Sequence, residues 1–230
     1  MERDQRTALL LGEENLKKLS DRHVAVFGLG GVGSYTAEAL ARTGVGTLTL
    51  IDCDVYTPSN LNRQLFATQE TLGQKKTDAA KARLAQVAPD CTVHTVDLFY
   101  TPENADEIDL SAFDAIADAI DTVSGKTELI VRAFRAGIPL ISSMGTGNKL
   151  DPTRLTVRDL YETSGCPLAR VMRHELKKRG VTALPVVFSD EPAAKAVEES
   201  VPGRHAPGSA VFVPACAGMI LAAEIVKRLL

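Results

Sequence analysis

Residues 23–33 read His-Val-Ala-Val-Phe-Gly-Leu-Gly-Gly-Val-Gly, and this stretch decides the fold. Its first part is a short apolar run rich in β-branched residues, which is typical of a buried strand. Residues 34–43 carry apolar side chains at helical spacing, so the glycines occupy a turn between a strand and a helix. Such a turn can be an ordinary feature of an α/β domain. In this context, however, it predicts a site where backbone N–H groups bind a phosphate.

The glycines of this turn have distinct expected tasks. Gly28 would make the tight turn, Gly30 would let the main chain approach a phosphate, and Gly33 would let the helix pack close to the strand. A second apolar run, residues 47–51, ends at Asp52. A strand-ending aspartate can simply form a turn, but its offset from the glycines favours hydrogen bonds from the carboxylate to ribose hydroxyls.

The residues after Asp52 favour ATP over a nicotinamide cofactor. Residues 59–64 read Ser-Asn-Leu-Asn-Arg-Gln, and Lys76 follows at the start of a predicted helix. Asp121 ends a later strand-like run and can hold a magnesium ion through its carboxylate. An arginine, a lysine and an acid beside a glycine turn provide the charge neutralisation that nucleotidyl transfer needs, whereas NAD binding needs no such set.

In these residues the chain resembles the ubiquitin-activating-type adenylating enzymes, which include the activators of the small sulfur carriers of thiamine and molybdopterin synthesis. The shared motifs are Gly-Leu-Gly-Gly-Val-Gly, Asp52-x-Asp54, Ser59-Asn-x-Asn-Arg-Gln64, Gly73-x-x-Lys76 and Asp121 at a strand end. The resemblance implies an enzyme that binds ATP and Mg²⁺ and adenylates a carboxylate.

The resemblance also implies roles for single residues. Asp52 would hold the ribose, and Asp121 would lie beside the metal. Arg6 would enter the ATP site of a neighbouring subunit, which implies a homodimer. The phosphates would be held by Asn62, Arg63 and Lys76. The candidate nucleotide-binding residues are Gly28, Gly30, Gly31, Gly33, Asp52, Asp54, Asn60, Asn62, Arg63, Gln64 and Lys76, and the candidate catalytic residues are Arg63, Lys76, Asp121 and Arg6.

Three further stretches are similar to the tRNA threonylcarbamoyladenosine dehydratases: residues 6–12, 143–152 and 168–180. This resemblance spans nearly the whole chain. It implies that the substrate is tRNA, that the carboxylate of threonylcarbamoyladenosine is adenylated, and that the modification then cyclises with loss of AMP. Because such a ring closure is intramolecular, the protein need not supply a nucleophile.

Three other functions stay open at this point. The adenylated acid can instead be the C-terminal carboxylate of a small ubiquitin-like sulfur carrier protein, with sulfur-relay proteins as partners. Many such activators carry a paired-cysteine zinc site. The four cysteines of this chain form no C-x-x-C pair, which weighs against that function. The remaining alternatives are an NAD-dependent oxidoreductase and a non-catalytic scaffold that binds a nucleotide.

The individual cysteines carry their own expectations. Cys166 lies in a predicted loop and is the best candidate for a reactive thiol, although an incidental role is favoured. Cys216 lies in an apolar stretch and is expected in the core. Cys53 lies between two aspartates, and this negative charge should raise the pKa of its thiol.

Length and composition predict one α/β domain over residues 1–230, of which 45% are hydrophobic. The expected fold is Rossmann-like: a mostly parallel sheet with helices on both faces, extended by antiparallel strands in the C-terminal half. Strands are expected near 24–28, 47–52, 92–97, 113–120, 138–143, 153–159 and 184–189. Helices are expected near 6–19, 34–43, 75–87, 124–136, 168–179 and 214–229.

Charge and hydropathy give the remaining predictions. The net charge of −3 excludes a general polyanion binder. A basic cluster between Arg170 and Arg179, with Arg132 and Arg135 nearby, is either a face for tRNA phosphates or a solvated helix side. The polar, turn-rich segment 190–208 is a predicted mobile crossover loop, with His205 on its surface. The apolar run 211–226 is shorter than the about 20 residues of a membrane span. With no signal peptide and unpaired cysteines, the chain is expected to be cytoplasmic, without a membrane partner.

Overall fold

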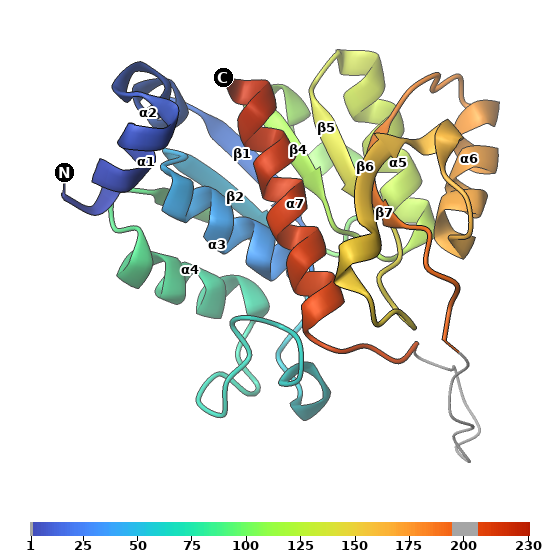
Figure 1. Ribbon diagram of the computed structural model, residues 1–230, viewed down its shortest axis with the longest axis horizontal. Helices are drawn as coiled ribbons and strands as arrows, with labels where there is room; N and C mark the ends of the chain where they lie inside the picture. The colour runs from blue at the N-terminus through green and yellow to red at the C-terminus, as the bar shows by residue number, and fades with distance from the viewer. Residues whose placement is uncertain (1, 195–206) are drawn as a thin grey trace.

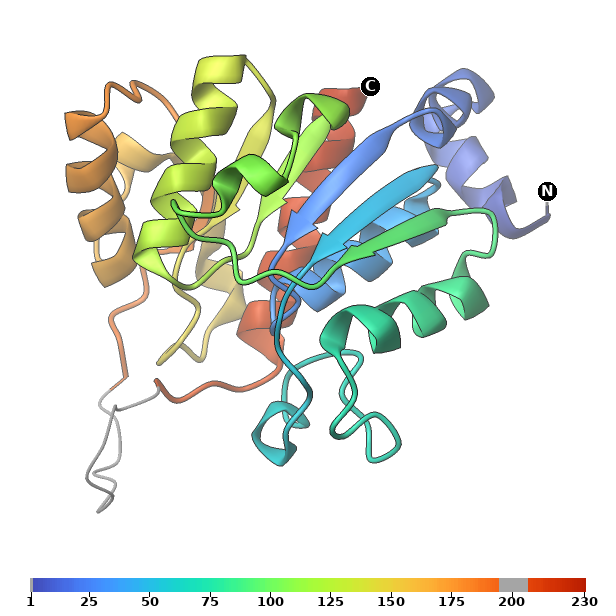
Figure 2. The ribbon, with the colours of Figure 1, turned by 180° about the vertical axis from the view of Figure 1, so that it is seen from behind.

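The computed structural model describes residues 2–194 and 207–230, and these form a single seven-stranded sheet between two layers of helices (Figures 1 and 2). The strand order is β3-β2-β1-β4-β5-β7-β6. The strands are β1 (His23–Phe27), β2 (Thr47–Ile51), β3 (Thr92–Val96), β4 (Ala115–Asp118), β5 (Leu140–Ser143), β6 (Leu155–Asp159) and β7 (Pro185–Ser189).

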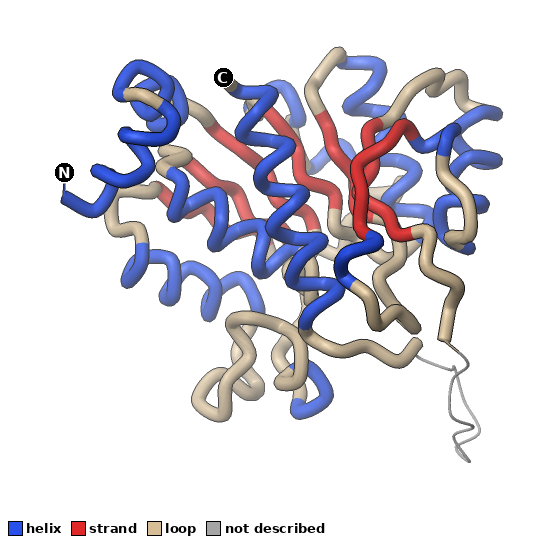
Figure 3. Tube along the Cα trace, in the orientation of Figure 1, coloured by secondary structure: helices blue, strands red, loops and turns tan. Residues whose placement is uncertain are grey.

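The predicted mostly parallel sheet with an antiparallel extension is confirmed. β7 still pairs parallel with β5, and the antiparallel part is the one edge pair β6–β7. Figure 3 shows the strands side by side through the centre of the molecule. The expected strand near 113–120 ends earlier, at Asp118, and the next residues form the turn that leads to α5.

Helices cover both faces of the sheet, as predicted. One face carries α3 (Gly33–Thr43), α4 (Lys76–Val87) and α7 (Phe212–Leu229), and the other carries α5 (Val123–Ala136) and α6 (Pro167–Lys178) (Figures 1 and 2). The C-terminal apolar run lies in α7, which packs against α3 and β5. Among the described residues, no helix combines the length and the apolar character that a membrane crossing requires.

The alternating side chains of β1 show why the sheet needs two helical layers. Successive residues of a strand point to opposite faces. Val24 and Val26 therefore pack in the core beneath α3 and α7, while Ala25 and Phe27 pack in the second core beneath α5. All of these side chains are fully buried, so β1 reads as a continuous apolar run.

The single helix predicted for residues 6–19 is two helices, α1 (Gln5–Leu11) and α2 (Glu13–Ser20). Gly12 separates them with φ 86° and ψ 149°. Only glycine adopts such a conformation at low cost. The apolar spacing on either side of Gly12 is helical, so it gave no sign that the helix is interrupted there.

The predicted mobile crossover loop falls largely on residues 195–206, outside the described residues, and so does His205. The chain on both sides of that segment is held at Asn148. Its carbonyl oxygen accepts from the N–H of Ala194 at 2.7 Å, and its N–H donates to the carbonyl of Gly208 at 2.7 Å. Asn148 therefore links Ala194 and Gly208, which lie in the described chain before and after residues 195–206.

The chain order around β1 defines where a ligand should bind. From β1 the chain moves outward through β2 and β3, and it then crosses to β4 and β5 on the other side of β1. The loops that leave the carboxyl ends of β1 and β4 therefore diverge. Open α/β sheets bind ligands at this topological switch point.

Candidate active site

A cavity of about 670 Å³ lies at the switch point, at the carboxyl ends of β1, β2, β4 and β5. Its volume is within the range of small-molecule sites, about 300–1,000 Å³. Most of the site residues predicted from the sequence line it: Gly28, Gly30, Gly31, Asp52, Asp54, Asn60, Arg63, Gln64, Lys76 and Asp121. Gly33, Asn62 and Arg6 do not line it.

The glycine turn has the geometry of an anion cradle. Gly28 has φ 86°, and a Cβ atom there would lie 2.7 Å from the carbonyl oxygen of Ala119. A Cβ at Gly33 would lie 1.8 Å from the carbonyl oxygen of Gly28, so Gly33 permits α3 to pack closely. α3 begins with Val32 as its N-cap, without a side-chain hydrogen bond. Ser34 in the first turn of α3 donates its N–H to the carbonyl of Gly30 at 3.1 Å, so the N–H groups that an anion can reach lie in the glycine turn that leads into the helix.

Two alanine substitutions in this turn should have opposite effects. Gly33→Ala should lower the melting temperature strongly or prevent folding, because its methyl group would overlap the backbone of Gly28. Gly30→Ala should leave the melting temperature nearly unchanged, because only the amide of Gln64 lies within 4.0 Å, but it should weaken ATP binding by closing the phosphate approach. Thermal unfolding and calorimetric titration with ATP measure both. A Gly30→Ala variant with full ATP affinity would contradict this assignment.

Asp52 is fixed at the end of β2 by backbone donors. Its carboxylate accepts from the N–H of Leu29 at 2.6 Å and from the N–H of Asp54 at 2.8 Å. Burial raises the pKa of Asp52, and the ammonium of Lys76 together with these N–H groups opposes that rise. Each carboxylate oxygen has a further lone pair, so the group can still accept hydrogen bonds from ribose hydroxyls.

Lys76, the first residue of α4, brings a buried cation to the cavity. Its ammonium lies 2.7 Å from the carboxylate of Asp54 and 3.9 Å from that of Asp52. Lys76 is 5% exposed, whereas the side chain of Asp54 is 63% exposed. A nucleotide phosphate can therefore take the place of the solvated Asp54 while Asp52 still contacts the lysine.

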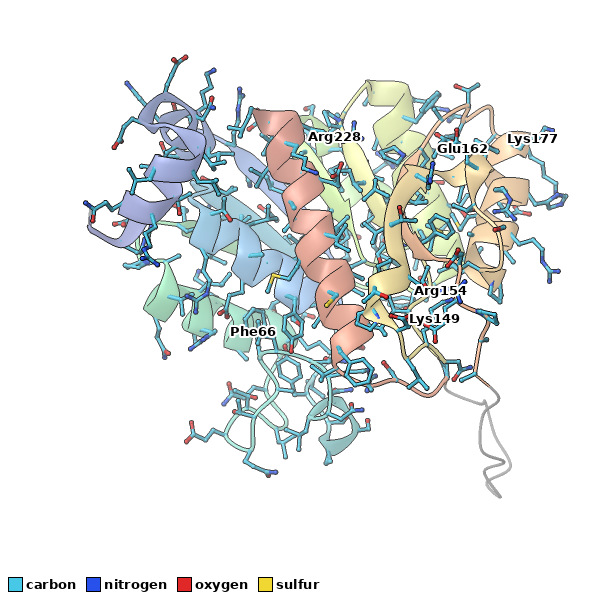
Figure 4. All side chains as sticks on the ribbon, viewed as in Figure 1. Phe66, Lys149, Arg154, Glu162, Lys177 and Arg228 are labelled. Carbon is cyan, nitrogen blue, oxygen red and sulfur yellow. The ribbon has the colours of Figure 1, made fainter. Side chains whose placement is uncertain are left out.

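The loop after β2 holds Arg63 and Gln64 at the cavity. The guanidinium of Arg63 donates to the carbonyl of Ser59 at 2.8 Å and to the Asn62 side chain at 2.9 Å. Phe66 anchors the loop in the core near α3 (Figure 4). Gln64 is buried, and its Oε1 has no hydrogen-bond partner in the described residues. A buried orphan acceptor at a cavity wall is expected to be satisfied by a ligand or water.

Asn60 and Asn62 have different surroundings, although the sequence treats them alike. Asn60 lines the cavity and accepts from the N–H of Thr57 at 3.0 Å in a capping box. Asn62 is exposed, outside the cavity lining, and donates to the carbonyl of Ser209 at 2.8 Å. In the structure the Asn62 side chain thus contacts both Arg63 and the chain at Ser209. The predicted contact between Asn62 and phosphate stays a prediction.

Arg6 lies on α1, is exposed, and is not among the residues that line the cavity of its own chain. Its predicted entry into a neighbouring subunit stays a prediction.

The possible metal ligands at the cavity are of two kinds. Ligand atoms of Asp52, Cys53 and Asp54 lie within 4.8 Å of one another. A thiol does not suit Mg²⁺, which prefers oxygen ligands. Asp121 is exposed at the turn between β4 and α5 and lines the cavity. Its carboxylate fits a magnesium ion that keeps several waters and shares the nucleotide phosphates.

The predicted rise in the pKa of Cys53 is confirmed. Burial contributes most, and the charges of Asp54 and Asp52 add to it. We therefore expect iodoacetamide to alkylate Cys53 more slowly at neutral pH than it alkylates a free cysteine. The rate should keep rising as the pH passes the usual pKa of a thiol. Bound ATP should slow the reaction further. Peptide mass spectrometry over a pH series measures this. Rapid alkylation at neutral pH would contradict it.

The sequence reading missed the apolar wall of the cavity. Phe99 is 56% exposed, and Tyr100 packs edge-on against Phe27 at a centroid distance of 5.2 Å. Met144 and Leu168 add to the wall from beyond β5 and from α6. An exposed aromatic ring beside a phosphate cradle suits a nucleobase. The run Leu98-Phe99-Tyr100 directly after a predicted strand is the signal that could have found it.

Two cysteines can be compared with their predictions. Cys166 is 3% exposed at the N-cap of α6 and packs in the core, which favours the incidental role over a reactive one. Cys216, expected in the core, is only partly buried on α7, and this prediction needs correction. Neither cysteine is among the residues that line the cavity.

Several cations of the basic cluster are already paired with other residues of the chain. Arg173 turns inward to hydrogen-bond Thr163, and Lys178 and Arg179 pair with Glu175. Arg132, expected to add to the cluster, pairs with Asp106 at 2.7 Å. Lys177 projects outward from α6 (Figure 4).

A family model described as the ThiF family matches residues 3–230. The chain belongs to the ThiF family. It is similar to the tRNA threonylcarbamoyladenosine dehydratase of Bacillus subtilis (strain 168), with 41% identity over 98% of this chain and 93% of that protein. The dehydratase of Escherichia coli (strain K12) is also 41% identical, over 80% of this chain and 72% of its own length.

Solved structures of related proteins have the same fold as this chain. The E. coli tRNA N6-threonylcarbamoyladenosine dehydratase TcdA, in complex with AMP, superposes with a TM-score of 0.92 at 37% identity and covers 99% of this chain and 94% of that chain. Its complex with ATP gives a TM-score of 0.90.

A more distant sequence relative is the molybdopterin-synthase adenylyltransferase of E. coli (strain K12). It is 34% identical over a smaller part, 64% of this chain and 58% of that protein.

Proposed function

We propose that this ThiF-family chain is an ATP-dependent tRNA threonylcarbamoyladenosine dehydratase. One observation carries the proposal: the glycine turn, Lys76, Arg63 and Asp121 meet in a single cavity at the switch point. The cavity supplies the parts for adenylation. The choice of acid is supported by the likeness to the B. subtilis dehydratase, which extends over 98% of this chain.

The chemistry proceeds in two displacement steps. A carboxylate oxygen of the substrate attacks the α-phosphorus of ATP, and the bond to the leaving pyrophosphate breaks. The resulting mixed anhydride is electrophilic, so the carbamoyl group of the same substrate attacks its carbonyl carbon, loses a proton and expels AMP. Because nucleophile and electrophile belong to one molecule, proximity supplies much of the acceleration of the second step.

The residues of the chain have specific tasks in this scheme. The N–H groups of the glycine turn that leads into α3 bind phosphate oxygens, and Arg63 and Lys76 neutralise the charge that develops as pyrophosphate departs. Asp52 orients the ribose. Gln64, with its orphan acceptor at the cavity wall, orients a polar group of either reactant.

Magnesium fits the donor set of the cavity. Asp121 would hold the ion together with phosphate oxygens, and a bound ion would supply Lewis-acid polarisation of the phosphate that is attacked. We also propose a homodimer in which Arg6 reaches the partner's ATP site. This would explain an exposed arginine on α1 that does not reach its own cavity.

Activation of a sulfur carrier is the weaker alternative. Among the described residues, the four free cysteines form no metal-binding group with one another. The similarity to the molybdopterin-synthase adenylyltransferase also covers less of the chain.

Nucleoside mass spectrometry tests the proposed function. Purified protein is incubated with ATP, magnesium and tRNA that carries threonylcarbamoyladenosine. The modified nucleoside should lose the elements of one water molecule, and omission of ATP should prevent the change. An unchanged nucleoside in the complete reaction would remove the proposal.

A further inference from the structure

A buried ion pair lies under the cavity, and the scheme above leaves it unused. Asp118 is the last residue of β4, and Lys126 lies in the first turns of α5. Both side chains are fully buried, and the ammonium lies 2.9 Å from the carboxylate. The turn between them, residues 119–122, lines the cavity and carries Asp121.

The pair holds both backbone polar groups of Ile120. The carboxylate of Asp118 accepts from the N–H of Ile120 at 3.1 Å, and the ammonium of Lys126 donates to the carbonyl of Ile120 at 2.9 Å. Ser142 on β5 donates to the same carboxylate at 2.6 Å. The orientation of the Ile120 backbone is therefore set from inside the core by two side chains.

This anchoring fixes the peptide that leads into Asp121. The bond between Ile120 and Asp121 is trans, since the described chain has no cis peptide. The N–H of Asp121 lies opposite the Ile120 carbonyl in that peptide plane, so it points away from buried Lys126. The position of the Asp121 backbone thus follows from the position of the lysine.

Stability alone gives little reason for such a pair. The desolvation of two buried charges offsets most of their attraction, and apolar replacements of similar volume are often as stable. The pair does provide a rigid backbone at the edge of a site. Functional groups need such support, because small displacements of a catalytic group are costly.

We propose that Asp118 and Lys126 are positioning residues that hold the turn 119–122, so that Asp121 presents its carboxylate to the magnesium and phosphates of the bound nucleotide. This inference rests on the proposed function, in which Asp121 lies beside the metal. It assigns to the buried pair the coupling between magnesium binding and nucleotide binding.

The test compares nucleotide affinity with and without magnesium. The main variant is the double substitution Asp118→Asn/Lys126→Met, which removes both charges at similar volume. The matched control is Arg22→Met/Asp114→Asn, an ion pair of 3.0 Å beyond the opposite end of β4 whose aspartate also accepts from a backbone N–H. Calorimetry with a non-hydrolysable ATP analogue gives the dissociation constant in each condition.

We expect the main variant to bind the metal-free analogue as the wild type does. The factor by which magnesium lowers the dissociation constant should be about tenfold smaller than in the wild type, which is within the usual range of coupling between two ligands. The control should keep the full tightening. Ser142→Ala, which removes one donor to Asp118 and leaves the pair in place, should lose a smaller part and serves if the double variant fails to fold.

Three results are decisive. Full magnesium-dependent tightening in both Asp118→Asn/Lys126→Met and Ser142→Ala would overturn the inference. So would a wild type that binds the analogue and gains nothing from magnesium, although nucleotide binding would then stand. A wild type that binds no analogue at all would instead remove the proposed function.

Discussion

Arg63→Ala should reduce the rate of AMP formation by about 10³-fold or more, which is the scale of losing a cation that stabilises phosphoryl-type transition states. The guanidinium is already oriented toward the cavity by Ser59 and Asn62. The variant therefore loses a preorganised donor rather than a flexible surface charge. Single-turnover formation of AMP from ATP in the presence of modified tRNA measures the loss.

Two companion variants make the Arg63 result specific. Arg83→Ala removes an arginine of α4 that pairs with Glu38 at 3.1 Å and does not line the cavity, so its rate should stay near that of the wild type. Arg63→Lys should recover only part of the rate, because an ammonium lacks the planar fork that binds two oxygens. Normal AMP formation by Arg63→Ala would remove Arg63 from the phosphate site.

Lys76→Met should lower the rate of AMP formation by about 10²–10³-fold, since it removes a preorganised cation beside the departing pyrophosphate. The fold should persist, because Asp54 is mostly solvated and buried Asp52 keeps its hydrogen bonds from the N–H groups of Leu29 and Asp54. AMP release and thermal unfolding are measured on the same preparation.

The neighbouring residue provides the matched control for Lys76. Lys75→Met changes an exposed lysine that pairs with Asp97, outside the cavity. It should leave the rate unchanged. Equal effects of the two substitutions would show that general surface charge, not the buried ammonium, is responsible.

Local patterns predicted the parts of the site that local backbone geometry determines. The glycines after β1 and the aspartate after β2 follow from a strand, a turn and a helix that are adjacent in sequence. The spacing of these residues along the sequence therefore predicted their places in the site. The parallel sheet followed in the same way from alternating strands and helices, and the edge pair β6–β7 completes it.

Other parts of the site depend on contacts between distant segments. The hydrogen bond from Asn62 to Ser209 spans 147 residues and takes Asn62 out of the cavity lining. Arg173 is turned inward by Thr163, so a basic helix face in the sequence is less basic in space. The pair Asp118–Lys126 looks like two ordinary charges until packing places both in the core.

Pyrophosphate and AMP release in a single turnover tests the central claim most directly. Enzyme in excess over tRNA that carries threonylcarbamoyladenosine, with magnesium and labelled ATP, should release one AMP and one pyrophosphate for each modified tRNA. Unmodified tRNA and a carrier protein with a C-terminal Gly-Gly should yield neither. If modified tRNA elicits no pyrophosphate from well-folded enzyme that binds ATP, the cavity does not adenylate this acid and the account is contradicted.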